Sequence, residues 1–172
     1  MSGTSVKRDF YITVCSNDIS NIGYGPILNL NSNSVFLNTM PQNIRLLGSW
    51  RVAVIQYSFS LDTTKTYDIS SLGQPIYIQT DFVEPVIAGS TTVDQVFTHY
   101  ISEGDIHVLP PDQVTTYPRV YVNVTGSLQY YPVSVQSLNK INIAFIDPLR
   151  NDTYAKFNTT IPTWITFHFV KL

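Results

Sequence analysis

The 172-residue chain has little charge and few helix-forming residues. Charged side chains make up 13% of it, about half the share of roughly 25% that is usual in soluble domains. Alanine occurs four times and glutamate twice, whereas valine and isoleucine together occur 34 times and threonine 18 times. This composition argues against a helical fold and favours β-strands. The net charge of −2 argues against a groove for nucleic acid.

Cysteine and long apolar runs are also scarce. The single cysteine, Cys15, has no partner for an internal disulfide, and we expect it to be a buried, inert thiol. No stretch approaches the roughly 20 apolar residues that a membrane span requires, so we expect no span. The polar start, MSGTSVKRDF, is unlike a signal peptide. We therefore expect the chain to be made, and to act, without passing through a secretory route.

Runs with a period of two, separated by turn residues, predict about eight strands. Residues 10–14, 76–81, 120–124, 141–145 and 164–169 all show this period of two. Long connections follow the first strand and span residues 61–74, which favours a Greek-key or jelly-roll topology over a meander. We therefore predict an all-β fold, a single jelly-roll β-sandwich of about eight antiparallel strands. Residues 9–172 form the domain, residues 1–8 an N-terminal arm, and residues 61–118 hold elaborated loops.

The most informative stretch is VFLNTMPQNIRLLGSWRVAVIQY, residues 35–57, which reads as two strands joined by a short hinge. Its second strand, from Trp50 to Tyr57, is apolar on both faces. Such a strand is expected inside a sandwich or against a neighbouring subunit. Trp50, Val52, Val54 and Tyr57 are therefore candidates for the core or for a subunit interface.

Tyrosine is abundant, with 11 copies, and a charge-poor, tyrosine-rich surface is typical of one that partners cover. A stable extracellular β domain is the alternative explanation of this composition. Tyr130 and Tyr131 could stack on sugars, but we favour subunit contact or cross-strand packing. His168 alternates onto the outer face of the last strand, where we expect a surface or interface role.

Motifs for catalysis are missing. The chain has no G-x-S-x-G elbow, no G-x-G-x-x-G pattern and no phosphate loop. His99 and His107 are eight residues apart without a nearby cysteine, which does not match a zinc site and leaves only a weak cation site as an alternative. We expect no enzyme activity, metal or cofactor. Lys7 and Arg8 are the only adjacent basic pair, at a solvated end or in an arm that contacts acidic material.

Three stretches carry a resemblance to a known family. They are FYITVCSNDISN, then VFLNTMPQNIRLLGSWRVAVIQYSFS, and the closing pair INIAFIDP and KFNTTIPTWITFHFVKL. Residues 9–60 and 119–172 thereby resemble the penton (minor capsid) proteins of virophages, polintons and polinton-like viruses. The middle stretch keeps the family's proline, followed by Gly48-x-Trp50-x-Val52-Ala53. Residues 61–118 match little, and Pro148 to Asn151 replace a turn that often contains glycine.

The resemblance implies a structural virion protein. Five copies would form a homopentamer at the fivefold vertex of an icosahedral capsid, surrounded by trimers of a double-jelly-roll major capsid protein. The protein would be assembled in the host cell and located in the virion, with a host receptor or a vertex-associated protein as further partners. The alternative is a jelly-roll module for glycan binding or host attachment. An enzyme is the weakest alternative, because no nucleophile, base and orienting group can be assembled.

Overall fold

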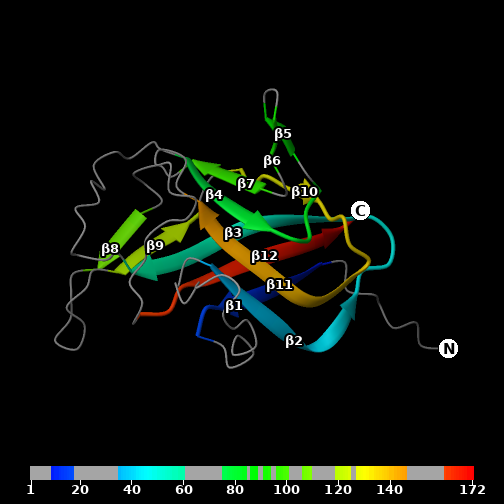
Figure 1. The fold of residues 1–172 in the computed structure, drawn as a ribbon, viewed down its shortest axis with the longest axis horizontal. Coiled ribbons are helices and arrows are strands. Elements are labelled where there is room, and N and C mark those ends of the chain that lie inside the picture. Colours follow the sequence, from blue (N-terminus) through cyan, green and yellow to red (C-terminus); the bar gives the residue numbers. More distant parts are fainter. Residues whose placement is uncertain are drawn as a thin grey trace.

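The computed structural model describes residues 9–17, 35–60, 75–84, 86–88, 91–93, 96–100, 106–109, 119–124, 127–146 and 161–172. Within these residues every regular element is a β-strand, which confirms the predicted all-β class (Figure 1). In chain order the strands are β1 (Asp9–Cys15), β2 (Val35–Arg45), β3 (Trp50–Ser60), β4 (Pro75–Thr80), β5 (Val86–Ala88), β6 (Thr91–Val93), β7 (Val96–Tyr100), β8 (Ile106–Leu109), β9 (Arg119–Asn123), β10 (Tyr131–Pro132), β11 (Ser137–Ile146) and β12 (Trp164–Lys171).

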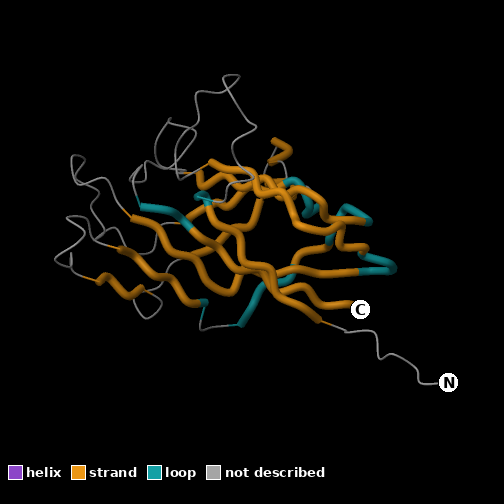
Figure 2. The backbone as a smooth tube through the Cα atoms, turned by 90° about the horizontal axis from the view of Figure 1, so that it is seen from below, coloured by secondary structure: helices purple, strands orange, loops and turns teal. Residues whose placement is uncertain are grey.

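Eight of these strands form two antiparallel sheets in the order of a jelly roll. One sheet runs β1-β12-β3-β9 and the other β2-β11-β4-β7. The first strand pairs with the last and the second with the last but one, so the chain is folded back on itself like a rolled hairpin. Figure 2 shows the strands as two layers. The predicted jelly-roll sandwich is thus the observed architecture.

Four short strands are added to this frame. β8 extends the first sheet beyond β9, β10 pairs with β3, and β5 pairs with β6 in a separate hairpin, which projects away from the sheets in Figure 1. Residues 61–118 are predicted to hold elaborated loops, and the parts that the structure describes there are strands β4 to β8 and the connection at residues 81–84. Their three- to six-residue lengths explain why alternation in the sequence marks only the longest of them.

The core lies between the two sheets and is filled by the inward residue of each alternating pair. On β12, Ile165, Phe167 and Phe169 have no exposed surface, whereas His168 between them points outward. From the connection after β4, the ring of Phe82 meets Phe167 edge-on at a centroid distance of 5.2 Å. Edge-to-face aromatic pairs of this kind add about 0.5–1.5 kcal/mol to the stability from burial alone.

The structure corrects the predicted environment of β3, because a β-bulge gives this strand only one apolar face. Thr166 pairs with Gln56 but the next residue, Phe167, pairs with Val54, so Ile55 is the extra residue. Without the bulge, Tyr57 would follow Ala53 and Ile55 onto the outer face. With it, Tyr57 turns inward, and its ring centroid lies 5.8 Å from that of Phe145 in the opposite sheet. The apolar residues that the sequence pattern assigns to the two faces of β3 are thus largely buried within one chain.

The turn between β2 and β3 depends on Gly48. This residue has a φ of +88°, in the left-handed region, and a Cβ atom there would lie 3.3 Å from Lys171 Cε. Gly48→Ala is expected to lower the free energy of unfolding by about 1–2 kcal/mol, because a side chain is strained at positive φ. Urea unfolding monitored by tryptophan fluorescence would measure this. Ser49→Ala in the same turn is the control, and an equal loss there would contradict the assignment to φ.

Candidate functional site

The outer face of the sheet β1-β12-β3-β9 carries most of the described outward-facing aromatic side chains. Alternation on β1 and β12 directs these side chains away from the core, since their neighbours Phe10, Ile12, Phe167 and Phe169 face it. We call this surface the outer aromatic face. It consists of Tyr11, Tyr121, Tyr130, Trp164 and His168.

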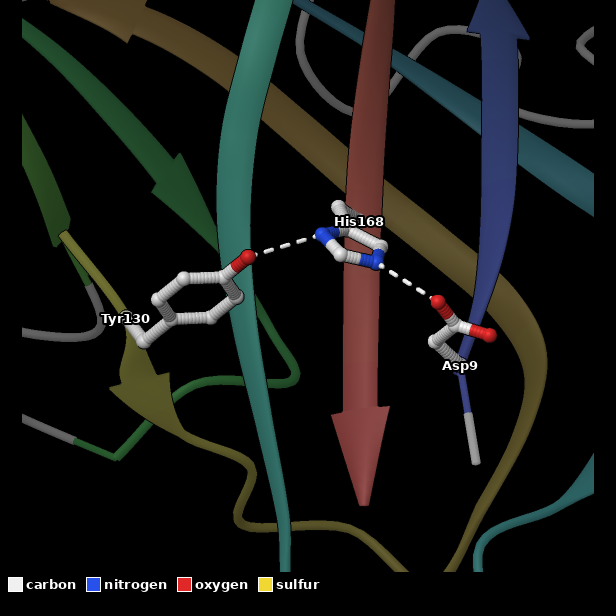
Figure 3. Close-up of polar contacts among 3 residues, drawn as sticks. All are labelled: Asp9, Tyr130 and His168. Carbon is white, nitrogen blue, oxygen red and sulfur yellow. Dashed lines mark hydrogen bonds and ion pairs between the residues drawn. The ribbon is translucent and has the colours of Figure 1, made fainter. Parts of the chain in front are cut away.

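His168 is the centre of the face, and three elements meet there (Figure 3). Its Nδ1 atom lies 2.7 Å from the hydroxyl oxygen of Tyr130, which reaches across β3 from the segment before β10. Its Nε2 atom lies 3.6 Å from Oδ2 of Asp9 on β1. Tyr11, its register partner on β1, stacks nearly parallel on the imidazole at a centroid distance of 4.4 Å. His168 thereby ties the first strand to the connection before β10.

A small residue makes this arrangement fit. Ala53 is the register partner of His168 on β3 and has no exposed surface, although its side chain lies on the outer face. The Tyr130 ring passes over the same strand to reach His168. A larger residue at position 53 would occupy the path of that ring.

The environment of Tyr130 favours the protonated form of its phenol. Burial first, and then the negative charges of ionised Tyr11 and Asp9, raise the pKa of its phenol above the usual value of 10.0. The phenol is therefore protonated at neutral pH and shares a hydrogen bond with Nδ1 of His168. A nucleophile needs the opposite shift, toward an anion at neutral pH. The cluster can hold strands together and offer aromatic surface.

A row of hydroxyl and amide groups continues the face away from His168. The hydroxyl groups of Thr13 and Thr166 lie 2.9 Å apart, and Gln56 donates to Thr166 over 3.3 Å. Beyond them Trp164 lies against Tyr121 of β9 at a centroid distance of 6.1 Å. These uncharged groups contact one another across β1, β12, β3 and β9. The face is therefore both aromatic and poor in charge, which is typical of the inner part of protein interfaces.

The structure separates the candidate residues into two groups. Trp50, Val52, Val54 and Tyr57 lie in the core. Tyr131 also faces inward, opposite Val52, and packs against the core.

Tyr130 and His168 lie on the outer aromatic face and contact each other. Lys7 and Arg8 lie outside the described residues. His99 is on β7 and His107 on β8, which belong to different sheets, and their side chains lie outside the described part.

Sequence reasoning missed Asp9, Tyr11 and Ala53. Alternation on β1 does predict that Asp9 and Tyr11 share a face, and this signal was available. Their meeting with His168 was not predictable, because it follows from the pairing of the first strand with the last. Among the described residues, no group of three or more His, Cys, Asp or Glu side chains is arranged to hold a metal ion. No helix in this part of the chain is long and apolar enough to cross a membrane.

The second sheet holds one carboxylate with a shifted pKa, that of Asp81 at the end of β4. Its two oxygens accept hydrogen bonds from the backbone N–H of Asn142, at 3.2 Å, and from the Asn142 side-chain amide, at 2.7 Å. Burial raises the pKa of Asp81 above its usual value of 3.8, and the hydrogen bonds from Asn142 oppose this only in part. The folded protein therefore binds the Asp81 proton more tightly than the unfolded chain does. The free energy of unfolding consequently falls as pH rises from the pKa of Asp81 in the unfolded chain to its raised pKa in the folded protein.

Asp81→Asn is expected to remove this dependence. The unfolding free energy of the variant, relative to that of the wild type, should increase as pH rises from about 3 to about 6. Urea unfolding at several pH values would measure it. Glu84→Gln removes an exposed negative charge three residues away and serves as the control for net charge. A difference between Asp81→Asn and wild type that is constant over the range would contradict this account.

No protein-family model matches this sequence, and no curated protein matches it.

Proposed function

We propose that this protein is a structural virion subunit, a penton (minor capsid) protein whose five copies close the fivefold vertex of an icosahedral capsid. The observation that carries the proposal is the strand order, β1-β12-β3-β9 against β2-β11-β4-β7. This is the jelly roll, an architecture that recurs in viral capsid proteins. The three sequence stretches that resemble penton proteins cover β1, β2, β3, β11 and β12 of that frame.

The outer aromatic face supports a role in assembly. Along β1, β12 and β3 its outward positions are mostly uncharged, with threonine, serine, alanine, valine, glutamine and aromatic side chains, and Asp9 and Arg51 are its exposed charged residues. A ring of five copies needs two different surfaces on each copy, because each contact in a closed ring is heterologous. We propose the outer aromatic face as one of these surfaces. The major capsid protein would surround the ring, and the N-terminal arm with Lys7 and Arg8 remains a candidate contact with it.

Mass measurement of the purified protein tests this proposal. Five chains of 19.4 kDa would form a particle of about 97 kDa in light scattering after size-exclusion chromatography. Tyr11→Ala should weaken the ring without unfolding the monomer, because the Tyr11 side chain is 60% exposed. Leu47→Ala, at an exposed residue in the turn before β3, is the control. A wild-type chain that stays monomeric, both alone and with its major capsid protein, would overturn the proposal.

Glycan binding by the monomer is the second candidate, and the exposure of Tyr11 favours it. One face of this ring lies on His168, which leaves the other face open beside the exposed Asp9 and Thr13. An open aromatic face flanked by carboxylate and hydroxyl groups is a suitable platform for a sugar ring. A glycan array with wild type and Tyr11→Ala separates the two functions. Saturable binding by a monomer that Tyr11→Ala abolishes would favour attachment over vertex assembly.

A further inference from the structure

One nitrogen of His168 is buried without a hydrogen bond. Nδ1 is paired with the Tyr130 hydroxyl group, but Nε2 is shielded from solvent and makes no hydrogen bond in the structure. Oδ2 of Asp9 lies 3.6 Å from it, beyond hydrogen-bonding distance. Because the carboxylate that faces Nε2 can only accept, we assign the proton of the neutral ring to Nε2, with Nδ1 accepting from the Tyr130 hydroxyl group. The imidazole therefore faces a carboxylate that lies just beyond hydrogen-bonding distance.

The groups around His168 leave Asp9 as the one nearby anion at neutral pH among the described residues. On β12 itself the same-face neighbours Thr166 and Val170 are uncharged. From β3, Ala53 faces the ring, and Arg51 is two residues further along and exposed to solvent. Tyr11 and Tyr130 contribute neutral rings at neutral pH. Arg51 opposes a positive charge on the imidazole, whereas Asp9, whose Oδ2 lies 3.6 Å from Nε2, favours one.

We propose that His168 is a proton-operated latch for the start of β1. When the imidazole takes up a proton from water, its Nε2–H becomes a charge-assisted donor, and the Asp9 carboxylate is drawn in to about 2.7–2.9 Å. At the other nitrogen, Nδ1–H now donates to the Tyr130 oxygen, and the phenol turns its own proton away. The Tyr130 contact therefore survives the change, and the Asp9 contact is gained.

The latch acts at the first residue of an edge strand. Asp9 is the first residue of β1, and β1 lies at the edge of its sheet with β12 as its one strand partner in the described part of the chain. The end of an edge strand opens locally at low free-energy cost. An ion pair at this end adds protection for the first residues of β1, whereas the pairing of Thr13 to Cys15 further along the strand is not affected.

Amide hydrogen exchange followed by NMR tests the latch. After correction for the intrinsic exchange rate, the amides of Phe10 and Tyr11 should exchange about 1.5- to 5-fold more slowly at pH 5.5 than at pH 7.5, the range expected of an exposed ion pair. The amide of Val14 serves as an internal reference. The slowing should diminish in about 0.5 M salt, which screens exposed pairs.

Variants decide whether Asp9 and His168 cause the effect. Asp9→Asn keeps the size and exposure of the side chain and should abolish the slowing. His168→Gln should abolish it as well, with a thermal melt to confirm that the variant is folded. Asp81→Asn, which removes a carboxylate from the other sheet, is the matched control and should keep the slowing. Equal corrected rates at both pH values in the wild type, or a slowing that persists in folded Asp9→Asn, would overturn the proposal.

Discussion

Trp50→Ala is expected to lower the free energy of unfolding by about 3–5 kcal/mol, a large part of the total for a domain of this size. Trp50 is 8% exposed and belongs to the core cluster. Its indole meets the Phe10 ring edge-on at 5.3 Å and donates its N–H to the Leu47 carbonyl oxygen over 3.2 Å. Phe10 in turn stacks on Phe169 at 4.9 Å, so the cavity would disturb three strands at once.

Urea unfolding and size-exclusion chromatography of Trp50→Ala measure the effect. Because Trp50 is in the core, stability and assembly should fall together. Trp164→Ala is the matched control for the urea unfolding alone, since Trp164 is half-buried on the outer aromatic face and its loss leaves a smaller cavity. A Trp50→Ala monomer as stable as the wild type, with assembly alone lost, would place Trp50 between subunits and contradict the fold described above.

A chain that stops after Thr163 is expected not to fold. It lacks β12, which lies between β1 and β3 and pairs with both of them. Its loss removes Ile165, Phe167 and Phe169, three core side chains without exposed surface, leaves β3 at an open sheet edge, and takes from β1 its one described strand partner. At about 3–5 kcal/mol for each buried aromatic alone, the loss exceeds the stability of an ordinary domain.

Circular dichroism and a urea titration test the truncation. The shortened chain should show no cooperative unfolding transition and should be recovered mainly in the insoluble fraction. A chain that lacks only Leu172, whose side chain is 70% exposed, is the control and should unfold as the wild type does. A cooperative transition in the shortened chain would mean that β1 and β3 can pair without β12.

Local patterns predicted the strands well because alternation reports burial directly. Phe10, Ile12 and Val14 on β1, and Ile165, Phe167 and Phe169 on β12, face the core as their period of two indicates. The prediction was wrong for the outer side of β3, where the sequence suggests two apolar faces. The bulge at Ile55 is set by the register against β12, and a single strand carries no signal of that register.

The outer aromatic face was less predictable than the fold. Alternation placed His168 on the outer side of the last strand, but its contacts come from β1 and from the segment before β10. Residues 11 and 168 are brought together by the pairing of the two ends of the fold, and periodicity describes each strand only by itself. The tight fit of Ala53 beneath the Tyr130 ring likewise depends on two separate parts of the chain, β3 and the segment before β10.

The nesting of the strands also has a consequence for synthesis in the cell. Cys15 pairs with Trp164, so about 150 residues separate the two halves of this ladder. At ribosomal speeds of about 5–20 residues per second, β1 waits roughly 8–30 s for its neighbour. During that time the apolar side chains of β1 cannot be buried against β12, and such distant pairing is intrinsically slow. Newly made chains are therefore expected to depend on chaperones or low temperature until the closing strand has been translated.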